Sequence, residues 1–277
     1  MSDGETWTRE ALTELRASRF TPSAWTRFLT RSVVRARERR AERPREHRTV
    51  VVLAAAGLAL WSVAAVAGRP WLAVAGGVWW LAQALMLDWH LGLLERPDGS
   101  RLDGLGSANL LTIVRGGLAP ALVVLAGSGA GVVLLVLAGA ADVADGRLAR
   151  RRDEATLLGV WLDGAVDTFV VGAAALGATL QGLLPAWATT LVVLRLVLPW
   201  LLATGVYFGR AERPPSAGLA AGRLASLAAG ATVFAGLALA FLHAPGAAAV
   251  VAAGAVGGIA ALVASVRRTL AAVVSAP

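Results

Sequence analysis

The feature that most constrains the fold of this chain is a series of long apolar stretches. Each approaches the roughly 20 residues that a helix needs to cross the hydrocarbon core of a bilayer. We read eight of them, at about 50–67, 71–89, 109–127, 130–145, 157–178, 186–208, 219–242 and 246–266. With 57% hydrophobic residues and a mean hydropathy of +0.65, the composition is typical of polytopic membrane proteins. The sequence therefore predicts an all-α, multi-pass integral membrane protein.

The placement of arginine predicts an orientation for these helices. If eight spans alternate in direction, the arginine-rich segments fall on one side of the membrane, and only Arg69 falls in a turn on the other. Positive residues are retained on the cytoplasmic side. We therefore expect both termini to face the cytoplasm. The segments on that side are Arg35–Arg48, Arg96–Arg101, Arg147–Arg152, Arg210–Arg213 and Arg267–Arg268.

The charge composition excludes some classes of function. The net charge is +8, and all 26 basic residues are arginine. Because these residues lie mainly beside spans, we expect them to contact anionic lipid headgroups rather than nucleic acid. The absence of cysteine excludes disulfides and thiolate metal sites. The abundance of alanine and glycine favours a bacterial source, hence the bacterial cytoplasmic membrane, and the first 48 residues lack the apolar segment of a signal peptide.

The chain divides into four predicted regions. Residues 1–48 form a cytoplasmic or interfacial segment with an amphipathic helix, and residues 49–92 form an accessory transmembrane hairpin. Residues 93–107 form a glycine-containing linker, and residues 108–277 form a six-helix core. The apolar stripe of the amphipathic helix could lie on the lipid surface or pack on the protein itself.

Four aspartates lie between two apolar stretches, and they are the strongest functional signal. Ionisable groups at membrane depth are costly and usually functional. Four carboxylates together repel one another unless a cation lies among them, and a divalent metal is the simplest candidate. The alternative is a buried network of acids paired with nearby arginines. The segment reads Asp142-x-x-Asp145-Gly146-x-x-Ala149-Arg150, then eight residues, then Gly159-x-x-x-Asp163-x-x-x-Asp167, and the nearby arginines are Arg147, Arg150, Arg151 and Arg152.

The spacing of these residues predicts one shared site. Residues three or four apart lie on one helix face, so Asp142 pairs with Asp145 and Asp163 with Asp167. If the two segments are antiparallel neighbours, both pairs converge. Gly159 lies one turn before Asp163 and leaves room for a ligand or a close helix. A divalent ion held by carboxylates and substrate phosphates is typical of phosphoryl-transfer sites.

This pattern resembles the signature of the CDP-alcohol phosphotransferase (CDP-alcohol phosphatidyltransferase) family. The resemblance covers roughly the last 170 residues and implies a fold with six core helices. It also implies transfer of a phosphatidyl or other substituted phosphoryl group from a CDP-alcohol, here CDP-diacylglycerol, to an acceptor alcohol, with release of CMP. The fixed positions that match are Asp142, Asp145, Gly146, Ala149, Arg150, Gly159, Asp163 and Asp167.

The same resemblance assigns expected roles. The four aspartates would hold one or two Mg²⁺ or Mn²⁺ ions, and Asp167 would also be the general base. Homodimerisation is implied by the family alone. The residues expected to bind the CDP-alcohol are Asn109, Thr112, Gly146, Ala149, Arg150, Thr156 and Gly159.

Some of these residues also have structural interpretations. Asn109 and Thr112 belong to an Asn-x-x-Thr-x-x-Arg motif that ends at Arg115, which could instead be a helix cap with an interfacial arginine. Thr156 is also a good N-cap for the following helix. By resemblance to basic groups on later helices, Arg195, Arg223 and Ser226 are candidates for binding an acceptor phosphate.

Two other functions use similar residues. An intramembrane prenyltransferase also binds a diphosphate through aspartates, but its acidic motifs lie on distant helix pairs. A transporter or an inactive scaffold could use the acids to bind ions, but the chain lacks two matched broken helices. The acceptor alcohol and the role of residues 1–92 stay open.

Overall fold

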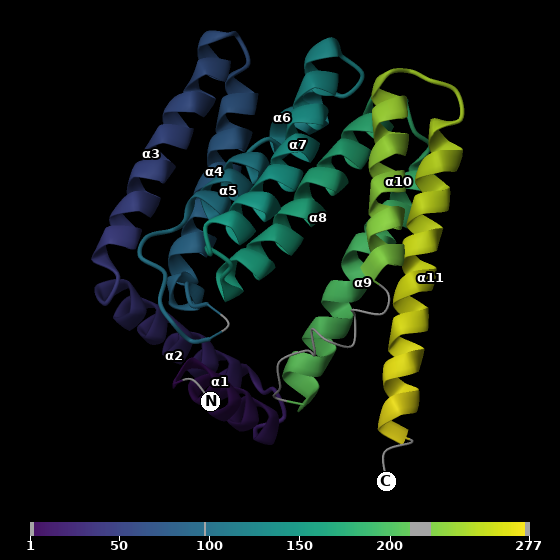
Figure 1. Cartoon of the computed structure of the whole chain (residues 1–277). Helices are drawn as coiled ribbons and strands as arrows, with labels where there is room; N and C mark the ends of the chain where they lie inside the picture. The colour runs from purple at the N-terminus through teal and green to yellow at the C-terminus, as the bar shows by residue number, and fades with distance from the viewer. Residues whose placement is uncertain (1–2, 97, 211–222, 275–277) are drawn as a thin grey trace. The chain divides into compact units, whose positions relative to one another are not determined.

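The computed structural model describes residues 3–96, 98–210 and 223–274, and the regular structure in these ranges is helical (Figure 1). This confirms the predicted all-α class. No strand occurs in them beyond one isolated bridge between Glu95 and Arg101. The helices are α1 (Asp3–Ala17), α2 (Pro22–Ala41), α3 (Pro44–Val66), α4 (Pro70–Trp89), the short 3₁₀ helix η1 (Leu91–Leu93), α5 (Ser107–Gly116), α6 (Ala119–Leu125), α7 (Gly129–Arg151), α8 (Leu157–Leu180), α9 (Ala186–Arg210), α10 (Arg223–Phe241) and α11 (Ala247–Val274).

Seven helical stretches in the described ranges are long and apolar enough to cross a membrane. They confirm a multi-pass membrane protein. The fourth predicted span (130–145) forms helix α7 (Gly129–Arg151), which is not one of the seven; its C-terminal half contains two aspartates and three arginines. The seven stretches are Pro44–Val66, Pro70–Trp89, Ser107–Leu125, Leu157–Leu180, Ala186–Gly209, Leu224–Phe241 and Ala247–Arg268.

Helices α3 and α4 pack closely because each places a tryptophan over a glycine of the other. A Cβ at Gly57 would overlap the Trp80 ring, and a Cβ at Gly76 would overlap the Trp61 ring. Trp80 Nε1 also donates a hydrogen bond to Leu53 O at 2.9 Å. A buried indole N–H needs such a partner, and this bond fixes the register of the two helices.

The α3–α4 pair packs against the C-terminal end of α5. Trp79 Nε1 donates a hydrogen bond to Gly116 O at 2.9 Å, and a Cβ at Gly117 would lie 2.5 Å from Trp80 Cζ3. The apolar cluster beneath these contacts contains residues from α3, α4, η1, α5 and α8. The accessory hairpin is therefore part of the packing that positions α5.

Helices α1 and α2 pack on each other through an apolar face. Leu12 and Leu15 of α1 and Ala24 of α2 are buried, and Glu14 forms ion pairs with Arg27 and Arg31. Part of the amphipathic face of α2 thus packs on the protein, although Leu29 stays 53% exposed. Packing on the protein is therefore seen for part of this face, and contact of the exposed part with lipid stays a prediction.

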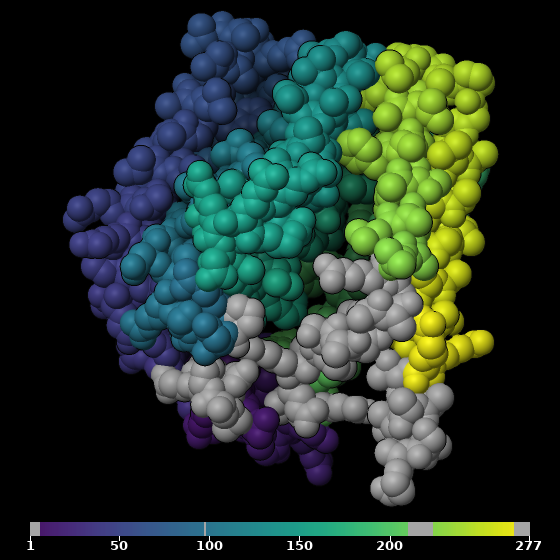
Figure 2. Space-filling view, in the orientation of Figure 1, coloured from purple at the N-terminus to yellow at the C-terminus, as the bar shows by residue number. Residues whose placement is uncertain are grey.

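The chain divides into two units, residues 1–122 with 136–170 and residues 123–135 with 171–277. In the second unit, α10 and α11 lie side by side (Figures 1 and 2). Gly254 permits this approach, because a Cβ there would lie 2.6 Å from Val233 N. Small residues commonly allow such close helix packing in membranes. The aspartates lie in the first unit.

Candidate active site

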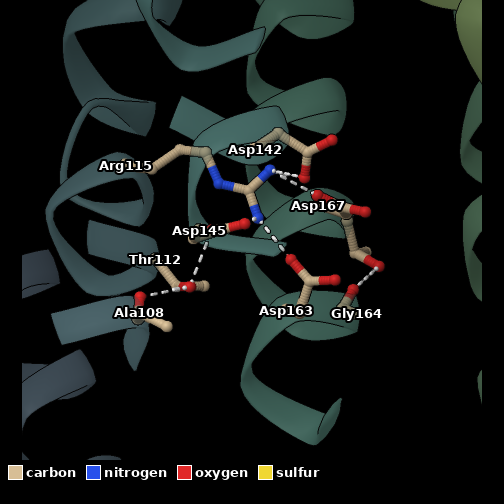
Figure 3. Close-up of polar contacts among 9 residues, drawn as sticks. Ala108, Thr112, Arg115, Asp142, Asp145, Asp163, Gly164 and Asp167 are labelled. Atoms are coloured by element: carbon tan, nitrogen blue, oxygen red, sulfur yellow. Dashed lines mark hydrogen bonds and ion pairs between the residues drawn. The ribbon is translucent and has the colours of Figure 1, made fainter. Parts of the chain in front are cut away.

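The four aspartates lie on two consecutive helices of one unit. Asp142 and Asp145 are on α7, and Asp163 and Asp167 are on α8, so each pair shares a helix face. One carboxylate oxygen each from Asp142, Asp145 and Asp163 lie within 4.8 Å of one another. Figure 3 shows the four carboxylates pointing into the same space. The structure thus brings together the residues that the sequence spacing places on two faces.

Arg115 on α5 lies among the four carboxylates (Figure 3). Its Nη1 donates to Asp142 Oδ1 and, at 2.6 Å, to Asp167 Oδ1. Its Nη2 donates to Asp163 Oδ1 at 2.7 Å and lies 3.7 Å from Asp145 Oδ2. The Arg115 side chain is only 3% exposed. A single guanidinium group therefore joins the acids of α7 and α8 to α5.

Both structural alternatives for these charges need correction. Arg115 is a buried partner of the aspartates rather than an interfacial arginine. Within the described ranges, the arginines at 147 and 150–152 form no ion pair with the four aspartates. The sequence analysis did not include Arg115 among the site residues. Its signal was the three-residue spacing that puts Asn109, Thr112 and Arg115 on one helix face.

The four carboxylates differ in their access to solvent. The Asp145 side chain is 6% exposed, whereas those of Asp142, Asp163 and Asp167 are 44%, 50% and 48% exposed. Asp145 Oδ2 accepts a hydrogen bond from Thr112 Oγ1 at 2.8 Å. The site therefore has a fixed inner carboxylate and three accessible outer ones.

The donor set suits a divalent cation. Mg²⁺ and Mn²⁺ prefer carboxylate oxygens, and three aspartates offer them within a short distance. If all four aspartates are ionised, one guanidinium leaves an excess of three negative charges. Arg115 Nε is also buried and has no hydrogen-bond partner in the described part of the chain. The charge balance therefore leaves a role for an additional cation, whereas the unsatisfied N–H could only meet a hydrogen-bond acceptor.

Asn109, Thr156 and Gly159 form a packed contact between α5 and α8. Thr156 Oγ1 accepts a hydrogen bond from Gly159 N at 3.0 Å, which is the N-cap interaction. Asn109 Nδ2 donates to Leu105 O at 2.7 Å. A Cβ at Gly159 would lie 2.8 Å from Asn109 Oδ1, so this glycine allows the two helices to approach.

Gly146, Ala149 and Arg150 lie on the last turns of α7. A Cβ at Gly146 would meet only Arg150 Nη1, at 3.5 Å, which is an ordinary contact. The Arg150 side chain is exposed. Gly146 and Arg150 are therefore not required for helix packing, in contrast to Gly159.

Glu154 is a residue that the sequence analysis missed. Its Oε2 accepts hydrogen bonds from Ser107 Oγ at 2.8 Å and Ala108 N at 3.1 Å, at the start of α5. Burial alone would raise the pKa of Glu154, but these hydrogen bonds hold the pKa below its usual value. Arg152 Nη1 also donates to Ser107 Oγ at 3.0 Å. The α7–α8 turn is thus attached to the helix that contains Arg115.

The candidates for an acceptor phosphate lie in the second unit. Arg195 on α9 donates from Nη2 to Ser226 O at 3.3 Å, and its side chain packs over Gly258 of α11. Ser226 contributes its backbone carbonyl to this contact, while its side chain is exposed. The side chain of Arg223 lies outside the described residues.

Comparison with known proteins identifies the family. The family model for CDP-alcohol phosphatidyltransferase matches residues 105–266, which is more than half of the chain. The chain belongs to this family. The family is named for phosphatidyl transfer from CDP-alcohols, which is a phosphotransfer reaction. The family favours this activity over the prenyltransferase and the transporter or scaffold.

Similar proteins occur in mycobacteria. The chain is 36% identical over 83 residues to proteins named "Putative cardiolipin synthase" from Mycobacterium bovis and from two strains of Mycobacterium tuberculosis. The match covers 28% of this chain and 40% of the length of each relative. No solved structure matches the chain significantly.

Proposed function

We propose that this phosphatidyltransferase moves a phosphatidyl group from CDP-diacylglycerol to an acceptor alcohol and releases CMP. The observation that supports this most strongly is the convergence of four aspartates on Arg115 in a chain of this family. The acceptor oxygen forms a bond to the phosphorus next to the diacylglycerol. The bond from that phosphorus to the bridging oxygen breaks, and the oxygen leaves with CMP.

Asp142, Asp145 and Asp163 are the proposed ligands of Mg²⁺ or Mn²⁺, with Asp167 beside them. When bound, the metal neutralises negative charge that develops on the phosphoryl oxygens. The hydrogen bond from Thr112 holds Asp145 in place as the inner ligand. Arg115 holds the outer carboxylates together and limits their mutual repulsion.

Asp167 is the proposed general base. Its side chain is 48% exposed and can therefore contact an acceptor hydroxyl. It removes the proton from that hydroxyl as the oxygen attacks. The hydrogen bond from Arg115 Nη1 orients its carboxylate, and this position matters because a base acts only within hydrogen-bonding distance of the proton.

The remaining residues divide into those that could contact the CDP moiety directly and those that support its site through contacts within the protein. Gly146 has open space beside it and Arg150 is exposed, so a CDP moiety could contact these two residues and the nearby Ala149 on α7. Asn109, Thr112, Thr156 and Gly159 already bond or pack within the protein, so they position the CDP site from behind. Arg195, Arg223 and Ser226 are proposed to bind an acceptor phosphate.

The name of the mycobacterial relatives supplies one candidate for the acceptor alcohol. Cardiolipin contains two phosphatidyl groups on one glycerol, so the name of the mycobacterial proteins makes phosphatidylglycerol one candidate acceptor. Glycerol 3-phosphate, inositol phosphate and serine are the others. A homodimer in a bacterial cytoplasmic membrane, with both termini and the aspartates facing the cytoplasm, completes the proposal.

The direct test is CMP release by the purified full-length protein in detergent. CDP-diacylglycerol is supplied with each acceptor in turn, with Mg²⁺ or Mn²⁺ or with EDTA, and the lipid product is identified by mass spectrometry. Metal-dependent CMP release with one acceptor would support the proposal and identify the substrate. CMP release that persists in EDTA would contradict the metal assignment, and no binding of CDP-diacylglycerol would contradict the donor.

A further inference from the structure

A cavity of about 660 Å³ lies where α2 meets α3, away from the four aspartates. Arg37 and Arg40 line it from the end of α2, and His47, Arg48 and Val51 line it from the first turns of α3. The three- and four-residue spacings put these side chains on one face of each helix. It is open to solvent along much of its length, since most of its lining side chains are exposed.

The cavity has an excess of positive charge. Asp88 of α4 is buried beside it, where it pairs with Arg40 and accepts a hydrogen bond from His47 Nδ1 at 2.7 Å. Arg37 and Arg48 are exposed and have no acidic partner among the described residues. Arg40 Nε is buried without a hydrogen-bond partner in the same ranges. One carboxylate therefore faces three guanidinium groups.

The N-terminus of α3 adds to this potential. Pro44 is the first residue of α3 and lines the cavity, so the positive end of the helix dipole lies beside the arginines. Three solvent-accessible arginines and a helix N-terminus together suit a phosphate group, which accepts charge-assisted hydrogen bonds.

The other end of the cavity is apolar and continues onto a membrane-spanning helix. Val51 and Val52 are 53% and 62% exposed on α3, which forms part of the molecular surface in Figure 2. Figure 1 shows α2 turning away from the end of α3 at this point. An occupant with a phosphate and acyl chains would place its charge on the arginines and its chains along α3.

We propose that this cavity binds the headgroup of an anionic phospholipid. The lipid is favoured over a soluble phosphate because the basic residues lie at the end of an exposed apolar helix. The site lies outside residues 105–266, which match the family, and it shares no residue with the aspartate cluster. It therefore assigns the accessory region a function in lipid binding.

The test measures lipid binding to the full-length protein in detergent by native mass spectrometry. Phosphatidylglycerol is the anionic probe, and phosphatidylcholine is the probe without net charge. The variant is R37Q/R48Q, and the control is R16Q/R45Q, which removes the same charge from exposed arginines that do not line the cavity. We expect R37Q/R48Q to weaken phosphatidylglycerol binding by about tenfold or more, because two charge-assisted hydrogen bonds to the phosphate are lost. Phosphatidylcholine binding and the control should be unchanged.

Other results would overturn the proposal. An equal loss in R16Q/R45Q would show attraction to overall charge rather than a site. Displacement of the lipid by an equal concentration of inorganic phosphate would indicate a pocket for soluble anions. Unchanged lipid binding in R37Q/R48Q would exclude the cavity. Because both arginines are exposed, we expect the variant to keep the wild-type melting temperature, which makes a loss of binding interpretable.

Discussion

Arg115 Nη1 on α5 donates a hydrogen bond to Asp167 Oδ1 on α8 at 2.6 Å, from a side chain that is only 3% exposed (Figure 3). The same guanidinium group contacts the carboxylates of Asp142, Asp145 and Asp163. One cation on a third helix thus holds together acids that would otherwise repel one another. The arrangement links folding of the helices to the chemistry of the site.

Replacing Arg115 with methionine should destabilise the protein and make it more dependent on divalent metal. Removal of one partner from a buried ion pair typically costs about 3–5 kcal/mol, because the remaining charges are left uncompensated. Added Mg²⁺ should restore part of this loss by binding the folded state. The melting temperature with and without Mg²⁺ tests this, with Arg147→Met as the exposed control on α7. If Mg²⁺ raised the melting temperature equally in both variants, Arg115 would not be the residue that offsets the charge of the aspartates.

Replacing Thr112 with valine should weaken metal binding by about 10- to 100-fold, because the partner that orients Asp145 is lost. Thr112 Oγ1 also bonds Ala108 O at 3.0 Å, four residues earlier. Thr232→Val is a matched control, because Thr232 makes the same type of bond to Ala228 O but has no aspartate partner in the described ranges. Mn²⁺ affinity, measured by calorimetry, should fall only in Thr112→Val. Equal affinities would show that Thr112 does not position Asp145.

The two glycines of the signature should respond differently to alanine. Gly159→Ala places a Cβ 2.8 Å from Asn109 Oδ1, so we expect a loss of about 1–3 kcal/mol of stability from overpacking. Gly146→Ala meets no close atom and should leave stability unchanged or slightly raised. If the CDP moiety occupies the space beside Gly146, that variant should still lose CMP release. A folded and fully active Gly146→Ala protein would contradict the proposed CDP contact.

Glu154 should stabilise the protein in a pH-dependent way. Its pKa is lower in the folded protein than its usual value of 4.5, so its contribution is present above that pH and is lost as the pH falls through the folded value. Glu154→Gln should therefore cost about 0.5–2 kcal/mol at pH 7, as for a helix cap, and much less at pH 3. Unfolding at both pH values tests this, with the exposed Glu10→Gln as control. A difference that does not shrink at low pH would refute the assignment.

Part of this structure could be predicted from local spacing. The 3.6-residue helical repeat places Asp142 with Asp145 and Asp163 with Asp167, and the length of the apolar stretches predicts the helices. The position of Arg115 could not be predicted in the same way. The spacing shows that it shares a face with Thr112, but only tertiary packing decides that this face turns toward α7 and α8. The bond between Glu154 and Ser107 depends on the same packing.

The amphipathic face of α2 illustrates a second limit. An apolar stripe in a membrane protein has two suitable partners, lipid and protein, and the sequence pattern is the same for both. The buried Ala24 shows contact with protein, and contact of the exposed Leu29 with lipid stays a prediction. Gly159 raises a related question, because a glycine can make room for a ligand or for a helix. Its short approach to Asn109 shows that helix packing requires it.

The most direct test of the central claim compares CMP release by Asp167→Asn with that by the wild-type protein. Asp103→Asn is the matched control, since Asp103 is an exposed aspartate outside the cluster. Removal of a general base usually lowers the rate by about 10²- to 10⁴-fold. We predict such a loss of acceptor-dependent CMP release in Asp167→Asn, with Mn²⁺ still bound and with Asp103→Asn fully active. Wild-type rates in Asp167→Asn would contradict the proposal that this cluster is the phosphotransfer site.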